Sequence, residues 1–232
     1  MKQISTLLIL LALNSMPVLV KANELELAVQ KIEFQWAHIH YSVAKEQQPG
    51  AYKQLLANLK SVQAQYPNKA ELIIQQAIIV ASNAENISPL KALSAIHQAR
   101  DLLLQAIELD PNASEGAAFV TLGSLYYMVP SWPIAYGDND KAQKMLKKAL
   151  VINPNTIDAN YFYGDFLVMQ GRQKEAVAYF KRALAIPART TQVFADNQLH
   201  AQAQAQAQQA IMDNSQLVAV NKPILFTAAY AK

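Results

Sequence analysis

Residues 157–187 read IDANYFYGDFLVMQGRQKEAVAYFKRALAIP, two helical patterns joined by a turn at Gly171. In each pattern apolar residues recur three or four positions apart, as expected of helices that bury one face. Gly164 and Ala176 place small residues where two helix backbones can approach closely. Pro187 ends the second helix, because proline cannot continue helical hydrogen bonding. The stretch therefore predicts an antiparallel helix pair.

The second half of this pattern occurs three times along the chain. In each copy an alanine is followed seven positions later by alanine and an aliphatic residue, with a proline shortly beyond. The three copies are Ala99, Ala106, Ile107 and Pro111, then Ala142, Ala149, Leu150 and Pro154, then Ala176, Ala183, Leu184 and Pro187. One such pair cannot bury its apolar face alone, so the pairs must stack. We therefore expect an all-α fold of stacked antiparallel helix pairs.

These residues resemble the tetratricopeptide repeat (TPR), a helix-turn-helix unit of 34 residues. Ala149 and Ala183 lie 34 positions apart, and Gly123 and Gly164 occupy matching places in the first helix of each pair. The resemblance implies an all-α, right-handed solenoid of antiparallel helix pairs, with two repeats within residues 113–190 and a more divergent one within residues 23–112. The TPR is a scaffold, so it implies interaction with protein partners and gives no chemistry of its own.

The composition excludes several classes of function. The chain has no cysteine, which excludes a disulfide framework and a thiolate metal site. The net charge of +3 falls close to neutral once Lys2 and Lys21 are set aside, which argues against nucleic acid as a partner. The sequence shows no phosphate-binding loop, nucleophile elbow or metalloprotease helix. We therefore expect no catalytic residues, no metal and no cofactor.

Residues 1–22 have the layout of a cleavable signal peptide. A short positive start precedes the apolar run from Ile4 to Leu13, and Val20 and Ala22 supply small residues at the cleavage site. The apolar run is shorter than the ~20 residues of a membrane-spanning helix. We expect a soluble protein exported to the bacterial periplasm, without stable membrane insertion after cleavage.

Helical spacing of apolar residues predicts four helices before the repeats. They cover about 24–47, 51–65, 70–84 and 89–109, and Pro49 and Gly50 are expected to stop the first one. Residues 191–232 are expected to form a capping helix over about 196–212, followed by an apolar tail from Leu217.

The turn of the repeat before the last carries extra residues that read VPSWPIAYGD over 129–138. Its two prolines make it stiff. Trp132 and Tyr136 either contact a partner or pack over the repeat ends. Asp138 is a candidate ligand contact whose simpler role is to cap the following helix.

One face of the first helix in each repeat is expected to line a concave groove. Aromatic rings beside a carboxylate and a hydroxyl can hold a peptide or a small organic molecule, and the alternative is that these residues form the core between repeats. Arg189 could pair with Asp165, Asp196 or a ligand carboxylate. The expected groove residues are Val120, Ser124, Tyr127, Met128, Tyr161, Asp165, Val168 and Met169.

A narrower resemblance rests on the VPSWPIAYGD loop, on NYFYGD over 160–165 and on the tail around Arg189 and Asp196. Together these motifs resemble exported TPR-like proteins grouped with the T-component of TRAP transporters. The resemblance implies an accessory role, with a periplasmic substrate-binding subunit as partner and a homo-oligomer as one form.

Three hypotheses follow. The first is an exported, non-enzymatic scaffold that binds proteins through its groove and aromatic loop. The second is an accessory of TRAP-type uptake that binds or hands over a small organic ligand. The third, a hydrolase, requires Asp138, Asp165 and a histidine to converge.

Overall fold

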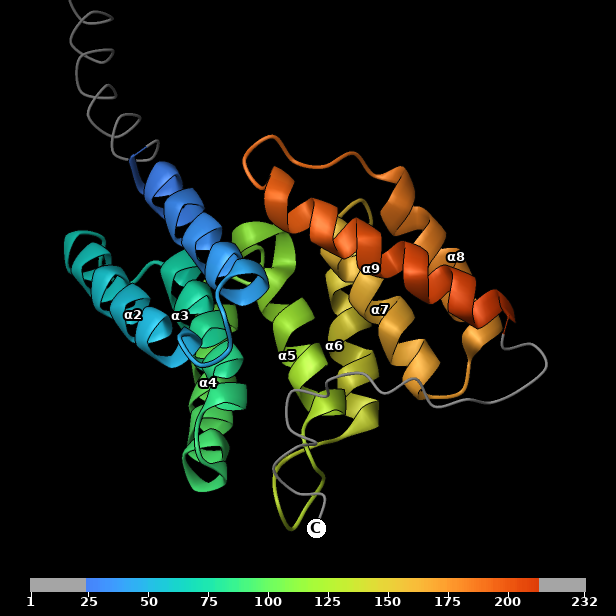
Figure 1. The fold of residues 1–232 in the computed structure, drawn as a ribbon, viewed down its shortest axis with the longest axis horizontal. Helices are drawn as coiled ribbons and strands as arrows, with labels where there is room; N and C mark the ends of the chain where they lie inside the picture. The colour runs from blue at the N-terminus through green and yellow to red at the C-terminus, as the bar shows by residue number, and fades with distance from the viewer. Residues whose placement is uncertain (1–23, 213–232) are drawn as a thin grey trace, which may run out of the picture.

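The computed structural model describes residues 24–212, and all regular structure within this range is helical. The signal peptide expected at 1–22 and the tail expected from Leu217 lie outside the described residues. The helices follow one another as antiparallel neighbours and curve into a right-handed solenoid (Figure 1). After a first helix over residues 24–42, the α-helices are α2 (Gln48–Gln65), α3 (Ala70–Asn83), α4 (Pro89–Leu109), α5 (Ala117–Met128), α6 (Asn139–Ile152), α7 (Ile157–Met169), α8 (Gln173–Ala185) and α9 (Val193–Met212).

The repeat pairs α5–α6 and α7–α8 pack closely at their glycines, as predicted. A Cβ atom added to Gly123 would lie 2.7 Å from Leu146 Cγ, and one added to Gly164 would lie 2.8 Å from the Phe180 ring. Leu146 and Phe180 are fully buried, so they occupy the space that the missing side chains leave. Ala149 packs with Ala159 of the next pair, which joins the two repeats.

The prediction for the first two helices is wrong at their junction. The first helix ends at residue 42, before the expected position 47, and Pro49 lies in the first turn of α2, where it does not break the helix. Proline is tolerated there because the first turn has no internal hydrogen bond to lose. Buried Gln48 accounts for the early end, because its Nε2 donates to the carbonyl oxygens of Ile39, His40 and Val43.

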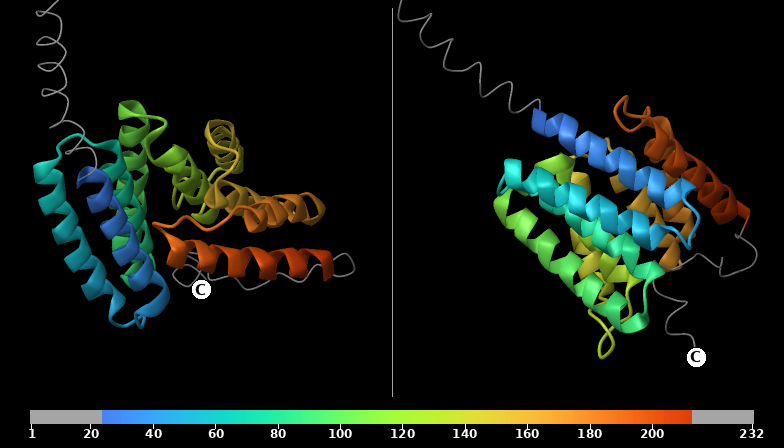
Figure 2. Two further views of the ribbon diagram at one scale, coloured as in Figure 1. Left: turned by 90° about the horizontal axis from the view of Figure 1, so that it is seen from above. Right: turned by 60° about the vertical axis from the view of Figure 1, so that its left-hand side comes forward.

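Other boundaries agree closely with the prediction. Helix α3 ends one residue before the expected position 84, and α4 covers the expected range, with Ser88 at the N-cap position. Helix α9 begins three residues earlier than expected and packs along α8 and α7 as the capping helix (Figure 2).

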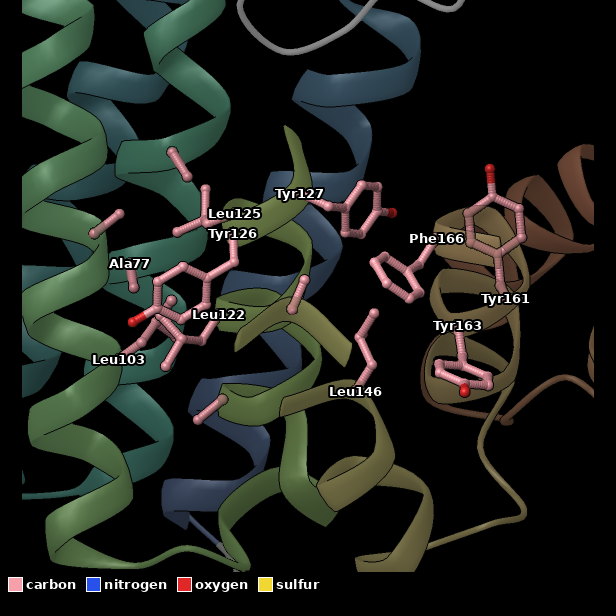
Figure 3. Close-up of a cluster of buried hydrophobic side chains, with 14 of the residues drawn as sticks. Ala77, Leu103, Leu122, Leu125, Tyr126, Tyr127, Leu146, Tyr161, Tyr163 and Phe166 are labelled. Carbon is pink, nitrogen blue, oxygen red and sulfur yellow. The ribbon is translucent and has the colours of Figure 1, made fainter. Parts of the chain in front are cut away.

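The core runs without interruption from α3 to α9. Figure 3 shows Ala77 of α3 and Leu103 of α4 beside Leu122 of α5. The same cluster continues through Leu146 to Phe166 of α7. A smaller cluster joins the first helix, α2 and α3. Helix α3 contributes residues to both clusters and so links the first two helices to the rest of the solenoid.

Candidate functional site: the concave groove

A groove of about 1200 Å³ lies on the concave side of the solenoid. Its walls come from helix 24–42, α3, α5, α7, the segment 189–192 and α9. Figure 1 looks onto this face, with helix 24–42 on one side, α9 on the other and α5 set between them. The groove is larger than the roughly 300–1,000 Å³ typical of small-molecule pockets.

The sequence predicted most of the central wall of this groove. Seven of the eight expected residues line it, and Val168 does not. Tyr161, Asp165 and Met169 are spaced four apart along one face of α7. Val168 lies at the edge of this face and packs against the core instead. Tyr127 and Tyr161 are also largely buried and belong to the core cluster, which is the alternative role considered for these positions.

A buried tyrosine–carboxylate pair joins α5 to α7 at the floor of the groove. Tyr127 donates its hydroxyl proton to Asp165 Oδ2 at 2.8 Å. Only 1% of Asp165 is exposed, although the residue lines the groove. The Tyr127 ring points toward Phe166, with centroids 5.6 Å apart (Figure 3). Burial, together with the neighbouring Tyr161, raises the pKa of Tyr127 far above its usual range, so the hydroxyl stays a donor.

Arg189 forms one of the three pairings expected for it. Its guanidinium binds the buried carboxylate of Asp196 and reaches Asp158 Oδ2 at 2.9 Å. Asp196 Oδ2 also accepts from the Arg189 backbone N–H at 2.7 Å. Burial opposes the guanidinium charge, but the hydrogen bond to Asp196 and the charge of Asp158 raise the pKa of Arg189 overall. The residue thus fixes the segment before α9 against α7.

Sequence reasoning missed Glu33, which connects the two sides of the groove. Its Oε1 accepts from Gln75 Nε2 of α3 at 2.9 Å, and its Oε2 accepts from Gln192, just before α9. Burial raises the pKa of Glu33 to about 7, against the opposing charge of Arg189. The only signal available was spacing, since residues 33, 37 and 41 share one face of the first helix.

Aromatic residues of the first helix extend this wall. Tyr41 meets Phe194 of α9 edge-on, with centroids 6.2 Å apart, and burial raises the pKa of Tyr41 to about 12. Trp36 stacks on His40, with ring centroids 5.3 Å apart. Burial and the charge of Lys45 lower the pKa of His40 to about 4, so its imidazole is neutral at pH 7.

The structure places the two aromatic side chains of the 129–138 loop differently. Tyr136 packs down: its hydroxyl donates to the Ile96 carbonyl oxygen at 2.8 Å, and Arg100 lies over its ring. Trp132 is 86% exposed and stands free of the core. Asp138 caps α6 by accepting from the Lys141 backbone N–H at 3.0 Å, and this hydrogen bond lowers its pKa.

None of these loop residues lines the groove, so Asp138 and Asp165 do not share a site. Within residues 24–212, no group of three or more metal-ligating side chains comes together. Over the same range, none of the helices has the length and apolar character that crossing a membrane requires.

Comparisons with known proteins agree with this architecture. Residues 134–203 match the sequence profile of the tetratricopeptide repeat family. The crystal structure of TTC0263, a thermophilic TPR protein in Thermus thermophilus, is similar with a TM-score of 0.54 and 18% identity, covering 70% of this chain and 74% of that one. The fold is a solenoid of the TPR type. The crystal structure of MamA is more distant, with a TM-score of 0.41 and 18% identity over 73% of this chain and 92% of that one. No curated protein matches this sequence significantly.

Proposed function

We propose that this TPR-type solenoid is a non-enzymatic scaffold that binds an extended segment of a partner protein in its concave groove. The groove itself carries the proposal: it is open, continuous over five helices, and larger than a small metabolite needs. Extended segments suit such a surface, because side chains along the segment can enter successive parts of the groove. The expected signal peptide supports the bacterial periplasm as the place of action.

Exposed Trp132 offers the partner a second point of attachment. A large aromatic side chain exposed to water is typical of protein interfaces, where it supplies contact area at low entropic cost. The loop that carries it is anchored by Tyr136 and by the hydrogen bond from Asp138 N–H to the Tyr126 carbonyl oxygen, 2.8 Å long. Trp132 is therefore presented from a fixed base.

A photo-crosslinking amino acid tests the proposal directly. We would place it at Phe162, which lines the groove, and as a control at Val151, which is 76% exposed on α6 outside the groove. In living cells, the crosslinker at position 162 should give one defined partner, whereas the crosslinker at position 151 should not capture that partner. The proposal fails if both positions give the same products, or if neither gives any.

A groove-filling variant then checks the product with purified proteins. Thr121→Trp should abolish binding, because Thr121 lines the groove on α5, whereas Lys147→Trp on the exposed side of α6 should leave it unchanged. Circular dichroism of both variants confirms that the solenoid has folded. Binding by Thr121→Trp at wild-type affinity would place the interface elsewhere.

A second candidate is an accessory of TRAP-type uptake, favoured by the continuity of the groove beside Tyr161 and Asp165. Crosslinking from position 162 to a periplasmic substrate-binding subunit would support it, as would a small organic compound that copurifies with wild type and not with Thr121→Trp. If neither a substrate-binding subunit nor a small compound is found, the general scaffold remains the better proposal.

A further inference from the structure

The charges that line the groove are unbalanced. Among its described lining residues six are carboxylates and two are cations, Lys45 and Arg189. Lys45 pairs with Glu85 at 3.2 Å, and Arg189 is shared between Asp158 and Asp196. Both cations are therefore committed to carboxylates of the protein itself. The carboxylates are Glu26, Glu33, Glu85, Glu115, Asp158 and Asp165.

Aromatic rings are interleaved with these carboxylates. Tyr41 reaches the groove from helix 24–42, Tyr127 from α5 and Tyr161 from α7. Burial raises the pKa of each of these three hydroxyls. A neighbouring group raises it further in each case: Asp158 for Tyr41, Tyr161 for Tyr127, and Tyr41 for Tyr161. The electron-rich face of an aromatic ring attracts ammonium and guanidinium groups, as carboxylates do. A groove that combines both suits a cation.

We propose that the partner segment is basic: an extended peptide whose lysine or arginine side chains lie beside Glu33, against the rings of Tyr41 and Tyr161. This inference rests on the proposed function, since it names the chemistry of the segment that occupies the groove. An acidic segment, a nucleic acid or an anionic lipid surface would meet repulsion from the same carboxylates. A peptide also fits the size of the groove better than an isolated small cation does.

The geometry of Glu33 allows it to take part. Each of its carboxylate oxygens accepts one hydrogen bond from a glutamine, which leaves further acceptor positions for an incoming donor. The charged groups that face it are Arg189, Asp158 and Asp196. A bound guanidinium or ammonium would favour the ionised form of Glu33, so binding should release a proton near neutral pH.

Three fluorescein-labelled peptides of equal length test the inference against the full folded chain. In the first, arginine alternates with alanine; in the others, glutamate or serine replaces each arginine. Fluorescence anisotropy should show the arginine peptide binding at least about tenfold more tightly than either of the others, with the difference shrinking as salt is added. Affinity for the arginine peptide should also fall below about pH 7, where Glu33 takes up a proton.

Two matched variants separate the site from general charge attraction. Glu33→Gln should weaken binding of the arginine peptide by about three- to tenfold and remove its pH dependence around neutrality. Glu108→Gln makes the same change of charge on exposed α4, outside the groove, and should have no effect. Equal weakening by both variants would overturn the inference, as would binding of the glutamate or serine peptide as tightly as the arginine peptide.

The same assay distinguishes this inference from the proposed function. Binding of a serine or glutamate peptide that Thr121→Trp abolishes would show an occupied groove and disprove the basic segment. Failure of all three peptides, while position 162 still crosslinks to a partner, would also disprove the basic segment and leave the scaffold standing. Failure of the peptides together with an absence of crosslinks would remove both.

Discussion

The two halves of the solenoid bring their helices together by different means. In α5–α8 the pairs meet at glycines, where the neighbouring Leu146 and Phe180 fill the space of the absent side chain. In the helices before residue 110 buried alanines of α3 and α4 contribute to the core, and polar groups complete the packing. Buried Gln48 is hydrogen-bonded to the end of helix 24–42, and Trp36 Nε1 donates to Ser82 Oγ at 2.9 Å.

This difference explains why the complete repeat pattern, with its glycine, can be recognised in only one half of the sequence. A glycine required for close approach recurs at a fixed position, so it can be recognised. A glutamine that satisfies helix-end carbonyls has no fixed position, because it depends on how the chain turns between two helices. The groove nevertheless needs both halves, since its walls come from each.

The largest effect is expected at Gln48. Gln48→Met keeps the size of the side chain and removes its hydrogen bonds to three carbonyl oxygens and to Asn86 Nδ2. We expect a loss of about 3 kcal/mol in the free energy of unfolding, because these buried groups would lose their partner. Urea denaturation measures it. Gln54→Met, on the exposed face of α2, is the control. An equal loss of stability there would mean that the hydrogen bonds of Gln48 contribute nothing.

The next largest change in stability is expected at Gly123 and tests the close approach of the helices in α5–α8. In Gly123→Ala the new methyl group would lie 2.7 Å from Leu146 Cγ and 3.2 Å from the Leu146 backbone nitrogen. Overpacking should exceed the gain in helix propensity and cost about 2 kcal/mol. Leu146→Ala, destabilising alone, should cost less in the Gly123→Ala background. Strict additivity in this double-mutant cycle would refute a direct clash.

The sequence predicted the fold and the central wall of the groove because both depend on local pattern. Gly123, Gly164 and the alanine spacing fix the pairs, and the register of α7 places Tyr161 and Asp165 on the concave face. Glu33 could not be found this way. It lies in a helix outside the recognisable repeats, and its partner Gln192 is 159 positions away.

Local propensity failed at one junction for a related reason. Pro49 and Gly50 are typical helix breakers, and the sequence alone does not show that they begin a helix instead of ending one. The side chain of Gln48 decides the matter, because it is buried beneath the end of the first helix and takes up the carbonyl groups there. Only the packed structure shows that arrangement.

A smaller change in the free energy of unfolding is expected at Glu33, where the two halves meet. The pKa of Glu33 rises from 4.5 to about 7 on folding. The folded state therefore favours the protonated form of Glu33. Ionised Glu33 destabilises the folded protein, and this destabilisation is absent below about pH 4.5, grows between about pH 4.5 and pH 7, and is complete above about pH 7. Glu33→Gln should raise the free energy of unfolding by about 1 kcal/mol at about pH 8 and have little effect at about pH 4.5. Thermal denaturation at both pH values measures this change. Exposed Glu26→Gln is the control, and destabilisation by Glu33→Gln at the higher pH would contradict the direction.

The smallest effect contrasts a glycine of the first half with those of the second. Gly50 lies in the first turn of α2, and an added Cβ would meet nothing within 4 Å. Gly50→Ala should therefore stabilise the protein by about 0.5 kcal/mol, since alanine has less backbone freedom to lose on folding. The gain should appear as a higher urea midpoint with an unchanged slope. The same substitution should thus have opposite signs at Gly50 and Gly123, and a loss of stability at both would mean that the N-terminal half also depends on a close approach at its glycine.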